Sequence, residues 1–182
     1  GNNAREIMNI LSIESASTVC GAALFLSSKL VELDEIDQPR IHGKRLPVII
    51  HDILNNHSVN IDQLDGIAIS SGPGSYTGLR IGMSISRGLA ASGEIPLIPV
   101  PTLFSMNVKI QNNGVYWLML HSHKDLVYTQ RYYSGIPNSE SIFSPKLFSS
   151  EVKERKGTLS LIILSVTPLL MIPNAGSILY SS

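Results

Sequence analysis

The alternation of apolar and polar positions along the chain predicts a mixed α/β protein. Three short segments, residues 7–13, 18–26 and 29–36, are apolar or alternating and follow one another with short links, which is typical of an antiparallel meander. The period then lengthens to that of a helix in residues 45–57, "RLPVIIHDILNNH". The side chains predicted to share one side of this helix are Leu46, Ile49, Ile50, Ile53, Leu54 and His57.

The next segments predict a strand at 65–71, a helix after a Gly-rich turn, a strand at 95–100 and a weak helix from Thr102. This order fits an RNase H-like unit, whose sheet combines a meander with parallel crossovers. Further along, the pattern predicts a hairpin from 115–120 and 125–133, a short helix at 150–157 and a buried strand at 158–166. We therefore expect an RNase H-like domain in residues 1–112 and a smaller, incomplete second domain in 113–182.

The Gly-rich turn "GPGSYTG" (72–78) resembles a phosphate-binding turn, but it lacks the Lys-Ser/Thr pair of a P-loop. Its glycine spacing also fails the dinucleotide fingerprint. The helix that follows begins with free N–H groups, which allows weak binding of an anion. The sequence thus leaves a weak anion site as one alternative at this turn.

Packing explains more of the same residues. Gly74, Gly78, Gly82, Ser86 and Ala90 recur at every fourth position, so one face of the predicted helix carries almost no side chain. Such a face lets another backbone approach closely. On spacing alone, the chain's own core and a second subunit fit this stripe equally well. Gly93 is expected to cap the helix ahead of Pro96.

Composition and charge narrow the class of protein. The chain has 182 residues and 43% hydrophobic residues, enough for a globular core. Fourteen basic and fourteen acidic residues balance, which argues against a protein that grips nucleic acid by itself. The N-terminus shows no signal pattern, no apolar run reaches the roughly 20 residues that cross a bilayer, and Cys20 has no cysteine to pair with. We expect a cytoplasmic protein with no membrane contact.

Residues 72–90, "GPGSYTGLRIGMSISRGLA", closely resemble the signature of the TsaB (YeaZ) family. This family is the non-catalytic subunit of the bacterial machinery that makes threonylcarbamoyladenosine in tRNA. Residues 9–25, 42–54 and 95–103 follow in the family's order, and 119–133 follow more loosely. The resemblance fades after residue 133, and the second domain is shorter than is usual in the family.

The resemblance implies an α/β fold of the actin-like and Hsp70-like group, built from two RNase H-like units with mixed sheets, the second one shortened here. It also implies partners: the catalytic paralogue TsaD and the ATPase TsaE. The complex would move a threonylcarbamoyl group from threonylcarbamoyl-adenylate to the adenosine beside the anticodon, in tRNAs that read codons beginning with A. ATP and the adenylate are then used by the complex, and this chain alone binds no cofactor.

The family's pairing surface is formed by two early helices, which correspond here to residues 43–57 and 77–91. Combined with the bare stripe, this predicts a partner interface. A small-residue stripe is self-complementary about a two-fold axis, so we also expect a homodimer when the partner is absent. The predicted interface residues are Gly78, Leu79, Arg80, Gly82, Met83, Ser86, Arg87 and Ala90.

No catalytic residue and no metal site are predicted for this chain. The His-x-x-x-His ligand pair of TsaD-like proteins is broken, because Leu46 stands four residues after His42. His51 and His57 are six residues apart and fall on different helix faces. His121 and His123 fit one face of a strand, but the sequence around them offers no third ligand.

An autonomous nucleotide-binding enzyme of the actin-like and sugar-kinase group is the alternative function. The stretch that would serve it has a glutamate where an aspartate is usual, and no glycine opens its turn. A glycoprotease-like peptidase is disfavoured, because Ser75 lacks a Gly-x-Ser-x-Gly setting and Cys20 lies within an apolar strand. The residues of a possible vestigial nucleotide or anion site are Glu14, Ser15, Ser17, Gly74 and Ser75.

Overall fold

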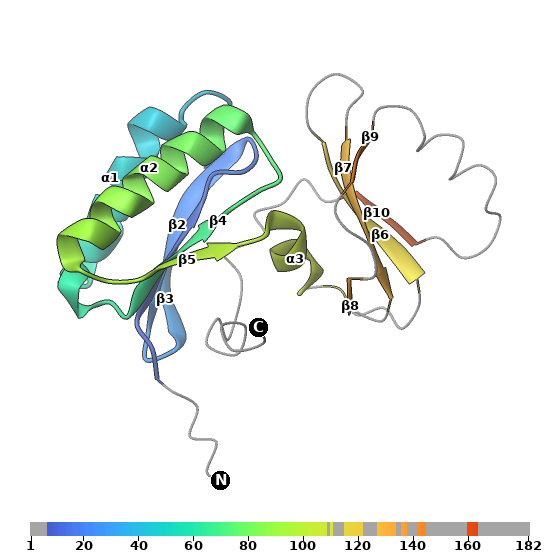
Figure 1. Ribbon diagram of the computed structural model, residues 1–182. Coiled ribbons are helices and arrows are strands. Elements are labelled where there is room, and N and C mark those ends of the chain that lie inside the picture. The colour runs from blue at the N-terminus through green and yellow to red at the C-terminus, as the bar shows by residue number, and fades with distance from the viewer. Residues whose placement is uncertain are drawn as a thin grey trace, which may run out of the picture.

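The computed structural model describes most of the first 133 residues and short parts of the rest. The described residues are 7–108, 110, 115–121, 127–133, 136–137, 142–144 and 160–163. Two sheets form in this part of the chain, and Figure 1 shows them on either side of a short helix. None of the helices in these ranges has the length and apolar content that a membrane-spanning helix requires.

The first sheet has the strand order β3-β2-β1-β4-β5. The meander of β1, β2 and β3 is antiparallel, with Ile10 opposite Phe25, whereas β4 and β5 run parallel to β1 and to each other. This is the combination of meander and crossovers that was predicted for an RNase H-like unit. The strands are β1 (Ile10–Glu14), β2 (Val19–Leu26), β3 (Lys29–Asp37), β4 (Gly66–Ser70) and β5 (Leu97–Val100).

Two helices, α1 (His42–Asn56) and α2 (Tyr76–Gly93), lie side by side over one face of this sheet. A one-turn 3-10 helix, η1 (Ile61–Gln63), follows α1. Alternate residues of β1 point to the two faces, so Leu11 and Ile13 join the core beneath the helices. The predicted apolar side of α1 is confirmed for Leu46, Ile49, Ile50, Ile53 and Leu54, and His42 is buried with them.

The opposite face of the sheet carries a smaller apolar cluster. Ile10, Phe25 and Val100 are buried there, and Phe104 of α3 (Thr102–Asn107) packs against them. The weak helix predicted from Thr102 is therefore present, and it follows the end of β5, between the two sheets (Figure 1).

The second sheet has the order β10-β6-β7-β8, with β9 also paired to β7. The predicted hairpin is confirmed as β6 and β7, and the predicted strand at 158–166 is confirmed over β10, which runs parallel to β6. The helix predicted at 150–157 lies outside the described residues, and the division of the chain into two domains stays a prediction. The strands are β6 (Val115–His121), β7 (Val127–Tyr133), β8 (Ile136–Pro137), β9 (Ile142–Ser144) and β10 (Ser160–Ile163).

Two local expectations are corrected by the structure. Gly93 is the last residue of α2, and the left-handed cap is Glu94, with φ of 54°. Gly93 is needed for space instead, because a Cβ atom there would lie 2.5 Å from Ile61 Cγ2. His57 does not join the buried side of α1: it is the C-cap residue and pairs with Glu32 of β3.

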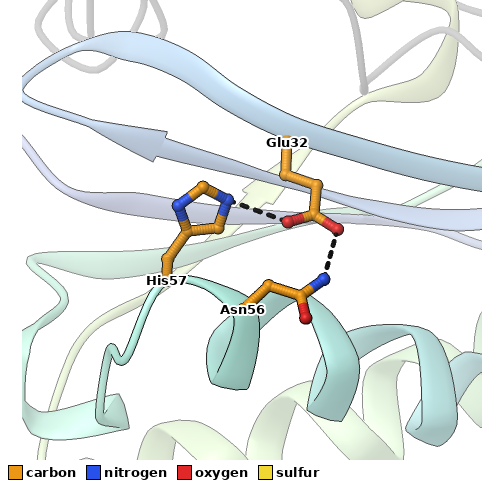
Figure 2. Close-up of polar contacts among 3 residues, drawn as sticks. All are labelled: Glu32, Asn56 and His57. Atoms are coloured by element: carbon orange, nitrogen blue, oxygen red, sulfur yellow. Dashed lines mark hydrogen bonds and ion pairs between the residues drawn. The ribbon is translucent and has the colours of Figure 1, made fainter.

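Figure 2 shows how this pairing anchors the end of α1 to the edge of the sheet. His57 Nε2 lies 2.8 Å from Glu32 Oε2. Asn56 Nδ2 donates a hydrogen bond to the other oxygen, Oε1, at 2.9 Å. One carboxylate on β3 therefore holds two successive residues at the end of the helix.

Candidate functional site

The Gly-rich turn joins β4 to α2. Gly72 has φ of +104°, a conformation that glycine adopts without strain. Ser75 is the N-cap residue of α2, and its Oγ accepts a hydrogen bond from the Gly78 N–H at 3.2 Å. The Ser75 N–H donates to the carbonyl oxygen of Ala16 at 2.7 Å. The start of α2 is thus tied to the turn between β1 and β2.

The small-residue stripe of α2 faces the chain's own sheet. A Cβ atom at Gly78 would overlap the carbonyl oxygen of Ser15, and one at Gly82 would overlap the Oγ of Ser15. The glycines therefore let the helix backbone touch the β1–β2 turn, with no room for a side chain between them. The buried residues of α2 are the stripe itself: Gly78, Gly82, Ser86 and Ala90.

The prediction that these four residues face a partner is wrong. Spacing could not separate the two alternatives, because a bare helix face accepts a strand of the same chain as well as a second subunit. The orientation of α2 on the sheet settles the matter: Ile69 Cδ1 of β4 lies only 3.1 Å from the position of a Cβ on Gly82. Any partner of α2 must contact another side of the helix.

The residues of the predicted vestigial nucleotide or anion site do come together around the β1–β2 turn, but several of their polar groups are engaged locally. Glu14 Oε1 accepts a hydrogen bond from the Ala16 N–H at 2.6 Å, and Ser17 Oγ accepts one from the Val19 N–H at 3.1 Å. A Cβ atom at Gly74 would overlap the Ala16 carbonyl oxygen. The hydroxyl groups of Ser17 and Ser75 thus satisfy nearby backbone N–H groups, and anion binding stays a prediction.

The exposed side of α2, which we call its outer face, points away from the sheet. Four of its residues, Thr77, Ser84, Gly88 and Ala91, are small and recur three, four or seven positions apart, so they form a strip of low bulk along this side. A Cβ atom at Gly88 would meet no atom within 4 Å. The outer face consists of Tyr76, Thr77, Arg80, Ser84, Arg87, Gly88 and Ala91.

Tyr76 and Arg80 form a pair on the outer face. Tyr76 is 74% exposed. Arg80 Nη1 donates to its hydroxyl at 3.0 Å, and the guanidinium carbon lies 5.3 Å from the ring centroid, within the range of a cation–π contact. Within the described residues, the ion pair that forms is that of His57 with Glu32, so Arg80 and Arg87 have no carboxylate partner there. Both arginines are exposed.

The two flanks of α2 are apolar. On one flank, Ile81 approaches α1, where its Cδ1 lies 3.8 Å from the position of a Cβ on Gly43. On the other flank, Leu79 and Met83 are half-buried, and Met83 packs against the main core. Leu79, Met83 and the two arginines keep exposed surface, so their contact with a partner stays a prediction.

The histidines of α1 are engaged in hydrogen bonds or ion pairs. His42 is buried, with Nε2 3.0 Å from the Ser17 carbonyl oxygen, and His51 Nε2 lies 2.8 Å from Asn55 Nδ2. Among the residues that the structure describes, no three His, Cys, Asp or Glu side chains form a group that could hold a metal ion. The side chain of His121 and all of His123 lie outside them.

Cys20 is fully buried on β2, as expected for an apolar strand. Burial raises the pKa of its thiol above the ordinary value, the charge of Arg45 opposes this shift, and that of Asp34 adds to it. A protonated thiol is a poor nucleophile. The structure therefore agrees with the inert role inferred for Cys20.

Five residues of the outer face were not predicted from the sequence: Tyr76, Thr77, Ser84, Gly88 and Ala91. Two signals were available. Tyr76 and Arg80 are four residues apart, which places them together on a helix. The small residues at 77, 84, 88 and 91 also follow the three- and four-residue spacing of a contact face. The stronger Gly-x-x-x-Gly repeat on the buried side masked this second stripe.

Comparisons with known proteins agree with this fold. The solved structure "YeaZ from Pseudomonas aeruginosa" superposes with a TM-score of 0.73 at 21% identity, covering 88% of this chain and 86% of that one. Another P. aeruginosa structure, described as an uncharacterized protein with similarity to peptidase YEAZ, has a TM-score of 0.74 at 20% identity and the same two coverages. These likenesses support the fold class that was predicted.

Sequence comparisons identify the family. The tRNA threonylcarbamoyladenosine biosynthesis proteins TsaB of Haemophilus influenzae and Escherichia coli are 34% and 37% identical over 99 residues. Each match covers 54% of this chain and 42% of the relative, so the chain spans less than half the length of these two proteins. The family model of TsaD, tRNA N6-adenosine threonylcarbamoyltransferase, matches residues 37–137. Since this is more than half of the chain, the chain belongs to the family that this model describes, among its TsaB (YeaZ) members.

Proposed function

We propose that this chain is a non-catalytic scaffold subunit that pairs with a TsaD-like catalytic chain. Threonylcarbamoyl transfer to the adenosine next to the anticodon would then take place in the complex, which a TsaE-like ATPase joins. The names of the TsaB relatives support a role in tRNA threonylcarbamoyladenosine biosynthesis. The similarity to the TsaD family model supports a paralogous partner. In this proposal ATP, threonylcarbamoyl-adenylate and tRNA meet the complex, and this chain binds no cofactor alone.

The observation that carries the proposed pairing is the strip of small residues on the outer face of α2. Ser84, Gly88 and Ala91 are exposed and small, so a partner helix can approach the α2 backbone closely. Arg80 and Arg87 border this strip, where they are available to the partner's carboxylates. The contact keeps Arg80 and Arg87 of the interface that the sequence predicted, but it replaces the buried stripe of Gly78, Gly82, Ser86 and Ala90 with the opposite side of the helix.

Co-purification of the tagged chain with the TsaD-like protein of the same organism tests this proposal. Gly88→Leu fills the open strip and should abolish the complex while the circular dichroism and melting temperature of the isolated chain stay unchanged. Gly88→Ala is the matched control and should retain most of the binding, since it adds a single methyl group.

If the Gly88→Leu variant binds the TsaD-like chain as the wild type does, the outer face of α2 is not the interface. If the wild type itself fails to bind, the scaffold proposal is lost. Calorimetry of the isolated chain with Mg-ATP tests the alternative function. Micromolar binding would favour an autonomous nucleotide-binding enzyme over a scaffold.

A further inference from the structure

The helix α3 (Thr102–Asn107) is unusually buried for a short connecting segment. Connections between elements normally run over the surface, because their backbone groups need water. In α3 the only residue that is not fully buried is Phe104, and Figure 1 shows the helix between the two sheets. The buried residues are Thr102, Leu103, Ser105, Met106 and Asn107.

The side chains of α3 belong to two different cores. Phe104 packs against the cluster on the open face of the first sheet, which includes Ala68 and Val100. Leu103 and Met106 instead pack into the core of the second sheet. The residues of the second sheet that share this core are Tyr116, Leu118, Leu120 and Tyr132.

Polar contacts secure both ends of the helix. At its start, the Thr102 N–H donates to the carbonyl oxygen of Gly72 at 2.9 Å, which links α3 to the turn that begins α2. At its end, the Tyr116 hydroxyl donates to Asn107 Oδ1. Tyr116 stacks on Tyr132 with ring centroids 5.5 Å apart and an angle of 10° between the rings. A continuous series of contacts therefore runs from the turn at the start of α2 to the centre of the second sheet.

We infer that α3 is a coupling element, which makes the first sheet, the start of α2 and the second sheet one cooperative unit. For the sheets to separate, either Phe104 must leave the first core, or Leu103 and Met106 must leave the second. Each of these movements exposes apolar side chains from a close-packed interior. Units joined by a plain linker share few such contacts and open independently. The inference does not depend on the proposed function.

The chain contains a native probe for each sheet. Its single tryptophan, Trp117, lies on β6 of the second sheet, and its single cysteine, Cys20, is buried in the first. Urea unfolding of the full chain can be followed by Trp117 fluorescence and by pulsed alkylation of Cys20. We expect the two probes to report the same midpoint in the wild type.

Met106→Ala should uncouple the probes. Truncation of a buried methionine loosens α3 from the second sheet, so the Trp117 midpoint should fall by about 1 M urea while Cys20 keeps its protection. Ile53→Ala is the matched control: it removes a buried side chain of the first core, far from α3 in sequence, and should lower both midpoints together. Tyr116→Phe replaces Met106→Ala in this test if the latter does not fold. It deletes only the hydroxyl that donates a hydrogen bond to Asn107 Oδ1.

Two results would overturn the inference. One is a wild type whose two probes already unfold at different urea concentrations, since the sheets would then open independently. The other is a folded Met106→Ala or Tyr116→Phe variant in which both midpoints fall together, because the coupling would then run through another part of the chain.

Discussion

Gly82 and Gly88 occupy the same helix but serve opposite purposes. Gly82 lies on the buried side of α2, where a Cβ atom would overlap Ser15 Oγ and come close to Ile69. Gly88 lies on the outer face, where a Cβ atom meets nothing within 4 Å. The first glycine is required by the packing of the chain itself. The second is a cost to the isolated helix of about 1 kcal/mol relative to alanine, and that cost has no compensation inside the described part of the chain.

Alanine substitutions should therefore shift the stability of the isolated chain in opposite directions. Gly88→Ala should raise the free energy of unfolding by about 0.5–1 kcal/mol through helix propensity. Gly82→Ala should lower it by about 1–3 kcal/mol, because the new methyl group overpacks the contact with Ser15. Urea unfolding of the two variants measures both effects. Equal effects of the two substitutions would contradict the inward orientation of the stripe.

Cys20 should make the stability of the protein depend on alkaline pH. Its pKa is raised in the folded state by burial, so folding favours the neutral thiol. The stabilisation is complete below the ordinary thiol pKa of about 8.5 and is lost as pH rises through the higher folded value. The free energy of unfolding should thus fall more steeply between pH 8 and about pH 10 in the wild type than in Cys20→Ala.

The comparison of pH slopes, rather than of absolute stabilities, isolates the thiol, since Cys20→Ala also leaves a small cavity. Alkylation of native Cys20 at neutral pH should be slow compared with the unfolded chain, because the side chain is fully buried. Rapid labelling of the folded protein, or identical pH slopes in the two proteins, would show that the thiol is exposed and unperturbed.

The helix α1 is held at its end by an ion pair and a hydrogen bond to β3. Glu32 forms the ion pair with His57 and accepts the hydrogen bond from Asn56. The side chains of Glu32 and His57 are 27% and 28% exposed. Partly exposed pairs contribute little, typically up to about 1 kcal/mol. The anchor therefore sets where α1 ends more than how stable the fold is.

A double-mutant cycle can measure this anchor. Glu32→Gln and His57→Asn should show a coupling energy of about 0.2–1 kcal/mol in urea unfolding at neutral pH. Glu35→Gln, an exposed carboxylate of the same strand, is the matched control and should show no coupling with His57→Asn. Zero coupling for the Glu32 pair would mean that the contact in Figure 2 does not persist in solution.

The whole chain should self-associate through the outer face of α2 when no TsaD-like partner is present. A strip of small residues on a helix is self-complementary about a two-fold axis, which closes a dimer. Light scattering should give twice the 19.8 kDa mass of the chain at micromolar concentration. Gly88→Leu should give the monomer mass with unchanged secondary structure. A monomeric wild type would refute the homodimer without affecting pairing with a TsaD-like chain.

Much of the fold could be read from local pattern. The meander, both long helices and the β6–β7 hairpin follow from apolar spacing, which reflects the two-residue repeat of strands and the 3.6-residue repeat of helices. The end of α2 could not be predicted from local pattern. Gly93 was predicted to be its cap, but Glu94 adopts the left-handed conformation, and Gly93 instead gives α2 room beside Ile61 of η1. Close approach between distant segments leaves no local signal.

The candidate site shows the same division. Spacing predicted that α2 has a bare face, since helix geometry follows directly from the order of residues. Which face is buried depended on how α2 lies on the sheet, where Ser15 and Ile69 fill the space beside Gly82. A helix can be rotated about its axis without any change in its own sequence pattern. Contacts with segments more than ten residues away select one rotation, and those contacts exist only once the chain has folded.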